Sequence, residues 1–127
     1  MKGLMNKGEV ILYVTDMASS VRFWHEQVGL ELVSHSGPDH TWEQEHWVVM
    51  DAGGFELCLH PGGVFVVESH SAFSLMVDDL EFALAGLAEK GINHSGVLNP
   101  HPGVIFAEVR DPDGHLFFIK PLQQAQD

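Results

Sequence analysis

The chain has 127 residues, of which 45% are hydrophobic, and a formal net charge of −12 from 6 Lys and Arg against 18 Asp and Glu. This length and apolar content suit one small domain, or two half-domains that share a core, and do not suit a disordered chain. The acidic balance argues against nucleic acid and anionic membranes as partners, because both bind through a basic face.

The cysteine content and the N-terminal sequence indicate the cellular compartment of the protein. A single cysteine, Cys58, excludes an internal disulfide and suits a reducing compartment. The N-terminus has no apolar run followed by a small-residue cleavage site, and no segment approaches the roughly 18 apolar residues of a membrane span. We therefore expect a cytoplasmic protein without an export signal or a membrane anchor.

The first half of the chain is predicted to form a β-α-β-β-β unit. Apolar and β-branched runs predict strands at residues 10–15, 30–34, 41–51 and 55–60. Apolar residues three and four apart predict a helix over residues 19–28. Asp16 or Ser19 can cap its start through a side-chain oxygen, and Gly29 lies just past its end.

After a connector at residues 61–70 the same pattern returns. Strands are predicted at residues 72–77, 92–98, 104–110 and 115–120, with a helix from Asp78-Asp79 to Gly91 and a loop at residues 99–103. The two halves align at a constant offset that pairs Asp16 with Asp78 and Gly29 with Gly91. Repetition at fixed spacing predicts two duplicated units, neither of which has enough core to be stable alone.

The last hairpin is built on the sequence AEVRDPDGHLFFIKP, residues 107–121. Its Asp111-Pro112-Asp113-Gly114 segment has the composition of a tight turn, and the aromatic run that follows predicts a strand. Together with YVTDMASSVRFWHEQVGLEL and FSLMVDDLEFALAGLAEKGI, this hairpin resembles the vicinal oxygen chelate superfamily, which includes glyoxalase I, bleomycin-resistance proteins and extradiol dioxygenases.

The resemblance covers about residues 9–121 and implies the architecture. The expected fold is α+β, with two tandem βαβββ modules forming a curved mixed sheet around a cleft. Residues 1–127 would be a single domain, with module one at about 9–60 and module two at about 71–121. A homodimer is expected, and the modules can pair within one chain or between two.

The resemblance also implies metal positions, because four side chains from the first and last strands of the modules usually meet in metal-dependent members. In module one these positions fall on Glu9 and Glu56. In module two the first-strand position falls on Ala72, or on Ser71 with a one-residue gap, and the last-strand position falls on Phe118; none of these side chains is expected to bind a metal. His70 would substitute if its strand starts that early. The implied set for Zn, Ni, Co, Mn or Fe is therefore Glu9, Glu56 and His70, with Glu56 also the candidate catalytic carboxylate.

The stretch FELCLH leaves two orientations open. Alternation places Glu56, Cys58 and His60 on one face of a strand. The resemblance turns this face toward the cleft, whereas the opposite orientation would expose it to water, with Glu9 at a solvated strand start. In the first orientation, the candidate ligand-binding residues are Tyr13, Trp42, His46, Trp47, Cys58 and Phe118, an aromatic lining with a few polar groups that is typical of small-molecule pockets.

Three functions follow from the resemblance. The first is a metal-dependent lyase of the glyoxalase I type, with Glu9 and Glu56 as ligands. The second is a metal-free protein that sequesters a cationic or aromatic antibiotic, which the acidic charge favours. The third is a dioxygenase-like enzyme whose atypical metal set includes His70 or His60. Metal content separates the second function from the other two.

Overall fold

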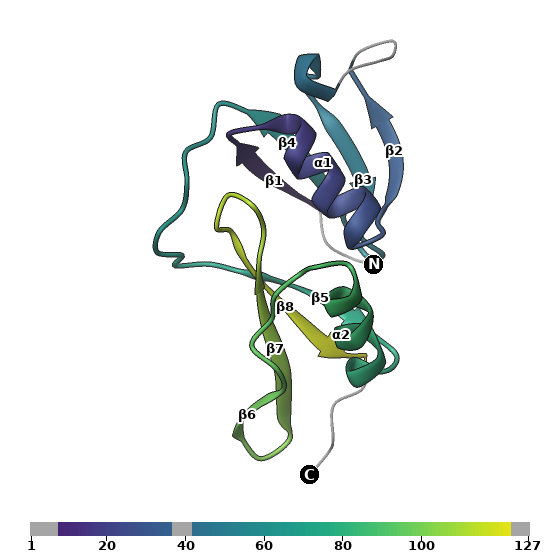
Figure 1. The fold of residues 1–127 in the computed structure, drawn as a ribbon, viewed down its shortest axis with the longest axis vertical. Helices are drawn as coiled ribbons and strands as arrows, with labels where there is room; N and C mark the ends of the chain where they lie inside the picture. Colours follow the sequence, from purple (N-terminus) through teal and green to yellow (C-terminus); the bar gives the residue numbers. More distant parts are fainter. Residues whose placement is uncertain (1–7, 37–41, 123–127) are drawn as a thin grey trace, which may run out of the picture. The chain divides into compact units, whose positions relative to one another are not determined.

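The computed structural model describes residues 8–36 and 42–122 and confirms the repeated β-α-β-β-β order (Figure 1). In chain order the elements are β1 (Glu9–Val14), α1 (Met17–Val21), the π-helix η1 (Arg22–Gln27), β2 (Glu31–His35), the 3-10 helix η2 (Trp42–Gln44), β3 (Val48–Asp51), β4 (Glu56–Pro61), β5 (Phe73–Val77), α2 (Leu80–Glu89), β6 (Leu98–His101), β7 (Val104–Arg110) and β8 (Leu116–Pro121). The chain divides into two compact units between Phe65 and Val66, inside the predicted connector. That both units belong to one domain remains a prediction.

The first unit contains a four-stranded mixed sheet in the order β1-β4-β3-β2. β1 and β4 run parallel, and the other neighbours are antiparallel. Register partners in a ladder point to the same side of the sheet, and successive residues alternate between sides. One side therefore carries the buried apolar side chains Leu12, Val14, Val48, Met50, Leu57 and Leu59. α1 packs against β4 and supplies the helical half of this core.

The start of α1 is fixed by the side chain predicted to cap it. Asp16 has extended backbone angles, and its carboxylate accepts hydrogen bonds from the backbone N–H of Ala18 at 3.1 Å and from Ser19 Oγ at 2.8 Å. The bond from Ala18 satisfies a backbone donor of the first helical turn, and the bond from Ser19 is the main cause of the lowered pKa of Asp16. The helix continues through the π-helical turns of η1, which bury Trp24 completely. Gly29 then takes a positive φ of 97° and ends it.

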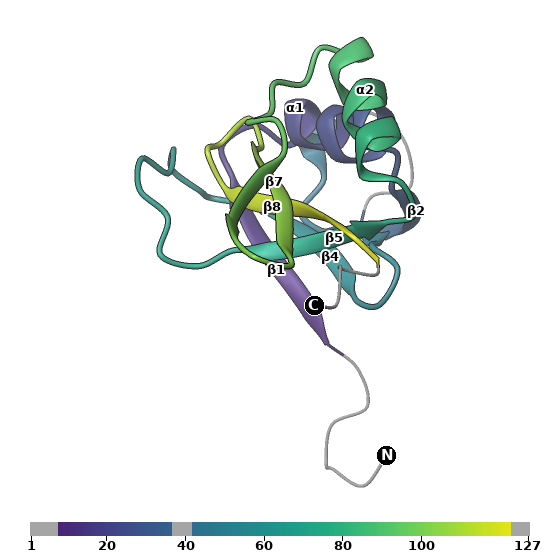
Figure 2. The same cartoon turned by 90° about the horizontal axis from the view of Figure 1, so that it is seen from below.

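The second unit repeats this plan with a sheet in the order β5-β8-β7-β6. Figure 2 shows β5, β8 and β7 of this sheet together with α2. β5 pairs in parallel with β8, and α2 packs against β8. The covered side of the sheet buries Leu75, Val109 and Ile119, and the rings of Phe73 and Phe117 stack there at 5.7 Å. Each unit is thus a helix laid on one side of a mixed sheet.

One predicted strand was too long, one was misplaced, and one alignment between the halves was wrong. The strand expected at 41–51 is helical at η2 and extended only from Val48, because side-chain hydrogen bonds replace a strand ladder before that point. The strand expected at 92–98 is irregular, since Gly96 has a φ of 79° and Ser95 bonds β7 through its backbone. β6 instead occupies the predicted loop, as an edge strand that tolerates its proline.

The alignment error concerns the second helix. The residue that caps α2 is Asp79, whose side chain accepts from the backbone N–H of Phe82 at 3.1 Å. Asp78, which the constant offset had paired with Asp16, lies one residue earlier. Gly91, paired with Gly29, does share its positive φ, at 84°. The start of the second helix is therefore shifted by one residue against the constant offset, whereas its terminating glycine is not.

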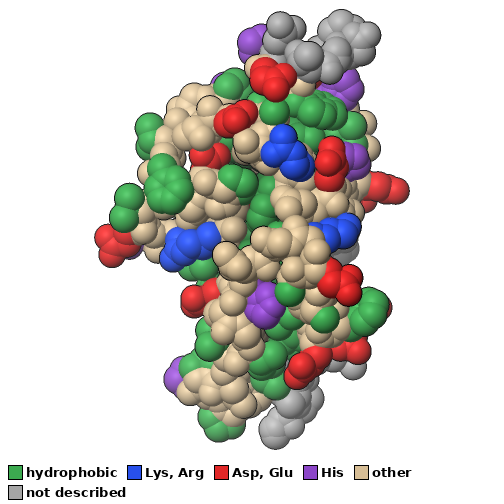
Figure 3. Space-filling view, in the orientation of Figure 1, with side chains coloured by type: hydrophobic (Ala, Val, Ile, Leu, Met, Phe, Trp, Pro, Cys, Tyr) green, Lys and Arg blue, Asp and Glu red, His purple; other side chains and the backbone are tan. Residues whose placement is uncertain are grey.

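The surface matches the acidic composition. Figure 3 shows acidic side chains spread over the visible face, with few basic ones among them. Among the described residues, no helix has both the length and the apolar character needed to cross a membrane.

Candidate functional site

The candidate site is the side of the first sheet that α1 does not cover, here called the acidic–aromatic face. Strand register assigns its members, which are Glu9, Ile11 and Tyr13 on β1, Glu56, Cys58 and His60 on β4, and Val49 and Asp51 on β3. Trp47, just before β3, joins them through its ring contact with His60. Tyr13 is 53% exposed and Ile11 40% exposed, whereas Cys58 in the middle is fully buried. The alternation predicted within FELCLH is present, with the leucines on the helix-covered side.

Two carboxylates and a thiol form one end of this face. Glu9 and Glu56 are register partners on the parallel strands β1 and β4. Cys58 Sγ lies 3.4 Å from Glu9 Oε1, and its S–H donates a hydrogen bond to that carboxylate. Burial raises the pKa of Cys58 to about 12, and the hydrogen bond and negative charge of Glu9, with the charge of Glu56, add to the effect. In the protein without a metal, the Cys58 thiol is therefore protonated and acts as a hydrogen-bond donor rather than as a nucleophile.

Three rings form the other end. Tyr13 and His60 are register partners, and their ring centroids lie 5.2 Å apart in a tilted arrangement. The ring of Trp47 meets His60 edge-on at 6.1 Å. The His60 Nδ1 atom is occupied by a contact of 2.7 Å with the carbonyl oxygen of Pro61. The face thus joins carboxylates to a short row of aromatic rings, with the exposed Tyr13 at its edge.

Two other predicted binding residues of this unit lie elsewhere. Trp42 belongs to η2, where its ring meets His35 edge-on at 5.3 Å. His46 is exposed, and its backbone N–H donates to Ser36 Oγ at 2.9 Å. The structure therefore brings Tyr13, Trp47 and Cys58 onto one face and places Trp42 and His46 in the segment that leads to it.

The second unit carries the remaining predicted residues. Phe118 lies on β8 opposite Ser74, on the side that α2 does not cover, and its ring meets Phe106 at 5.1 Å. His70 is exposed and lies before β5, which begins at Phe73. The condition under which His70 would substitute for Ala72, an early start of the strand, is therefore not met.

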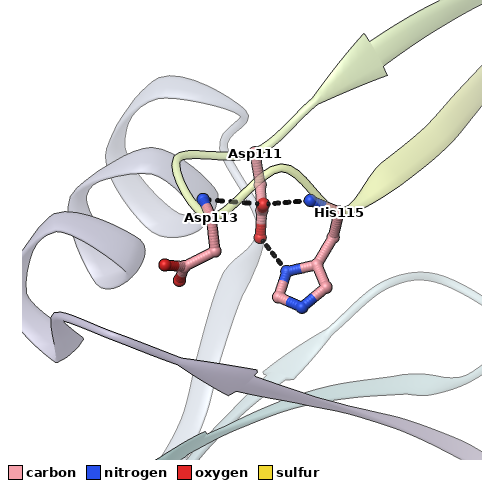
Figure 4. A group of neighbouring side chains, drawn as sticks. All are labelled: Asp111, Asp113 and His115. Carbon is pink, nitrogen blue, oxygen red and sulfur yellow. Dashed lines mark hydrogen bonds and ion pairs between the residues drawn. The ribbon is translucent and has the colours of Figure 1, made fainter. Parts of the chain in front are cut away.

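The predicted turn between β7 and β8 gathers three groups of metal-ligating type, Asp111, Asp113 and His115, whose ligand atoms lie within 4.8 Å of one another (Figure 4). Asp111 Oδ1 accepts from the backbone N–H groups of Asp113 at 3.0 Å and of His115 at 2.8 Å. Its Oδ2 accepts from His115 Nδ1 at 2.8 Å, which raises the pKa of His115. Gly114 closes the turn with a φ of 88°. Both carboxylate oxygens of Asp111 thus accept hydrogen bonds from within the turn and stabilise its conformation.

The metal set expected from the resemblance does not fit the described residues. Glu9 and Glu56 are register partners, and each offers one carboxylate. At the counterpart position of the second unit, Phe118 packs on Phe106 and Ser74 lies opposite. Catalytic zinc sites, for comparison, keep three protein ligands and an open position. Two carboxylates fall short of that number, and we assign no chemical step to a metal here.

Several residues of the face were missed from sequence. His60 was grouped with Glu56 and Cys58 and considered as an alternative metal ligand, but it was not predicted to be the ring that links Tyr13 to Trp47. Its place beside Glu56 follows from alternation, but its partner on β1 depends on a parallel register that no local pattern encodes. Ile11 and Val49 carry no chemical signal at all, and only the register assigns them to this face.

Comparison with known proteins identifies the class. Residues 8–119 match the family model of the Glyoxalase/Bleomycin resistance protein/Dioxygenase superfamily. Because this match spans most of the chain, the protein belongs to that superfamily, as the sequence resemblance predicted. No curated protein matches the chain.

Solved structures give the same fold at low identity. SMU.1112c superposes with a TM-score of 0.74 at 21% identity, over 92% of this chain and 98% of that one. A glyoxalase/bleomycin resistance protein/dioxygenase from Alicyclobacillus acidocaldarius gives 0.72 at 15% identity, over 97% and 96%. TnmS3, described as an antibiotic binding protein from Streptomyces sp. CB03234, gives 0.68 at 21% identity, over 95% and 99%. These likenesses establish the fold and leave the activity to the site.

Proposed function

We propose that this protein binds a small planar aromatic cation on the acidic–aromatic face and sequesters it without a metal. The observation that carries the proposal is the joining of Glu9 and Glu56 to the ring row of Tyr13, His60 and Trp47 on one side of the sheet. Rings bind a planar ligand by stacking, and they attract a cation placed over their faces by about 0.5–2 kcal/mol. The carboxylates add a charge preference.

The likeness to an antibiotic binding protein supports this class of ligand, although it extends to the fold alone. The charge of −12 also favours encounter with cations. The natural ligand would be a toxic aromatic compound with a basic group, held by Tyr13, Trp47 and the neighbouring carboxylates.

The test uses proflavine, a planar aromatic cation, and anthracenecarboxylate, an anion with a similar ring system. Proflavine should bind saturably in the presence of EDTA, and the anion should bind more weakly. Tyr13→Leu should weaken proflavine binding roughly 3- to 10-fold through loss of ring contact. Glu9→Gln should reduce the preference for the cation. Equal binding of both probes, or no binding of either, would contradict the proposal.

A second candidate is a metal-dependent lyase of the glyoxalase I type. One observation favours it, namely that Glu9 and Glu56 are register partners on the expected first and last strands. It predicts that Zn, Ni, Co, Mn or Fe(II) raises the melting temperature by mass action. It also predicts that Glu56→Ala abolishes this rise. If none of these metals raises the melting temperature, this candidate and any dioxygenase-like variant that uses His60 or His70 are excluded.

We further propose that the protein is a cytoplasmic homodimer. The fully buried single thiol suits a reducing compartment. Val64, Phe65 and Val67 in the connector are 76%, 62% and 84% exposed, which gives a chain partner apolar surface to cover. Sedimentation velocity measures the mass directly, and a monomer at all concentrations would refute the dimer.

A further inference from the structure

The first unit contains a buried carboxylate outside the acidic–aromatic face. Glu45, between η2 and β3, is only 3% exposed. Its Oε1 accepts from Ser36 Oγ at 3.1 Å, and its Oε2 lies 3.3 Å from His35 Nδ1. Burying a carboxylate is costly unless such partners compensate for lost water. The three side chains therefore form a specific contact set that the fold must maintain.

These contacts also fix the backbone that leads to the face. Ser36 Oγ accepts from the backbone N–H of His46 at 2.9 Å, and the backbone N–H of Ser36 donates to the carbonyl oxygen of Trp47 at 2.9 Å. The backbone N–H of Glu45 donates to the carbonyl oxygen of Trp42 at 3.1 Å. Ser36 therefore connects the buried carboxylate of Glu45 to the backbone of Trp47, whose ring belongs to the acidic–aromatic face.

Trp47 directly precedes β3, so its backbone position is set by the hydrogen bond from Ser36 as well as by the sheet. We propose that Glu45 is a positioning residue for the acidic–aromatic face, because its buried carboxylate holds Ser36 and thereby sets where Trp47 presents its indole beside His60. The inference rests on the proposed function for its effect on ligand, while the position of Trp47 can be tested without any ligand.

The ligand-free test is fluorine NMR of protein labelled with fluorotryptophan, which reports Trp24, Trp42 and Trp47 separately once each is assigned by substitution. Glu45→Leu removes the acceptor for Ser36 and should shift the Trp42 and Trp47 signals while leaving that of the buried Trp24 in place. Glu43→Gln changes an exposed carboxylate in the same segment and serves as the matched control. Glu45→Gln keeps one acceptor and should restore most of the wild-type spectrum.

The ligand test is a double-mutant cycle with proflavine. Glu45→Leu should weaken binding roughly 5-fold in the wild-type background and have little effect in a Trp47→Ala background, because residues that act through each other are not additive. An unmoved Trp47 signal, or equal losses in both backgrounds, would overturn the inference. If wild type fails to bind proflavine, the proposed function fails, and the spectra still decide whether Glu45 positions Trp47.

Discussion

The thiol of Cys58 provides a quantitative test of the site geometry. Its pKa of about 12, against an ordinary value of 9.0, leaves roughly 1,000-fold less thiolate at pH 8 than an unperturbed thiol has. Because the thiolate is the nucleophile, iodoacetamide should alkylate the native protein roughly 1,000-fold more slowly than the urea-unfolded chain, even before steric protection is counted. Mass spectrometry measures both rates.

Two substitutions assign the cause. Glu9→Gln removes both the charge and the ionised acceptor 3.4 Å from Cys58 Sγ, so native alkylation should accelerate roughly 10-fold. Glu56→Gln removes only a neighbouring charge and should have a smaller effect. The free energy of unfolding of each variant, measured in urea, controls for opening of the fold. A native rate that levels off near pH 9, or equal effects of the two variants, would refute the shared face.

Three further predictions test the framework around the site. Asp111→Ala removes the acceptor for two backbone N–H groups and for His115, and it should lower the free energy of unfolding in urea by about 2–4 kcal/mol. Because the pKa of His115 is raised in the folded protein, the stability that this pair gives the wild type is present below about pH 6.5 and is lost as pH rises through the folded pKa. The variant should lack this pH dependence. Gly63→Ala places a Cβ against the backbone of β1 and should cost about 1–3 kcal/mol, whereas Gly54→Ala, which meets nothing within 4 Å, should be nearly neutral in the same assay. Asp16→Ala should lower thermal stability by about 1 kcal/mol and Asp16→Asn much less, because asparagine still caps the helix; equal losses would argue against the cap.

The fold was predictable because its signals are local and repeated. Cap residues, turn glycines and alternating strands mark each βαβββ module, and the Asp111–Gly114 turn combines several of them in four residues. Predictions failed where side chains compete with the backbone ladder. Glu45 and Ser36 form such contacts before β3, and Ser95 does so before β6.

The candidate site was only half predictable. Alternation grouped Glu56 with Cys58 and His60, and the structure agrees. The pairing of this group with Glu9 and Tyr13 depends on the register of two parallel strands about 47 residues apart, which is set by packing under α1 rather than by any local motif. For the same reason, the sequence did not separate Trp47, which joins the face, from Trp42, which does not.

The most direct test of the account is to map the proflavine site on the protein by NMR chemical shifts in the presence of EDTA. The account predicts that the largest changes fall on the acidic–aromatic face, at Tyr13, Cys58, His60 and Trp47, with little change at the helix-covered residues Leu12 and Leu57. Changes confined to the Asp111 turn, or a requirement for added metal before any change appears, would contradict it.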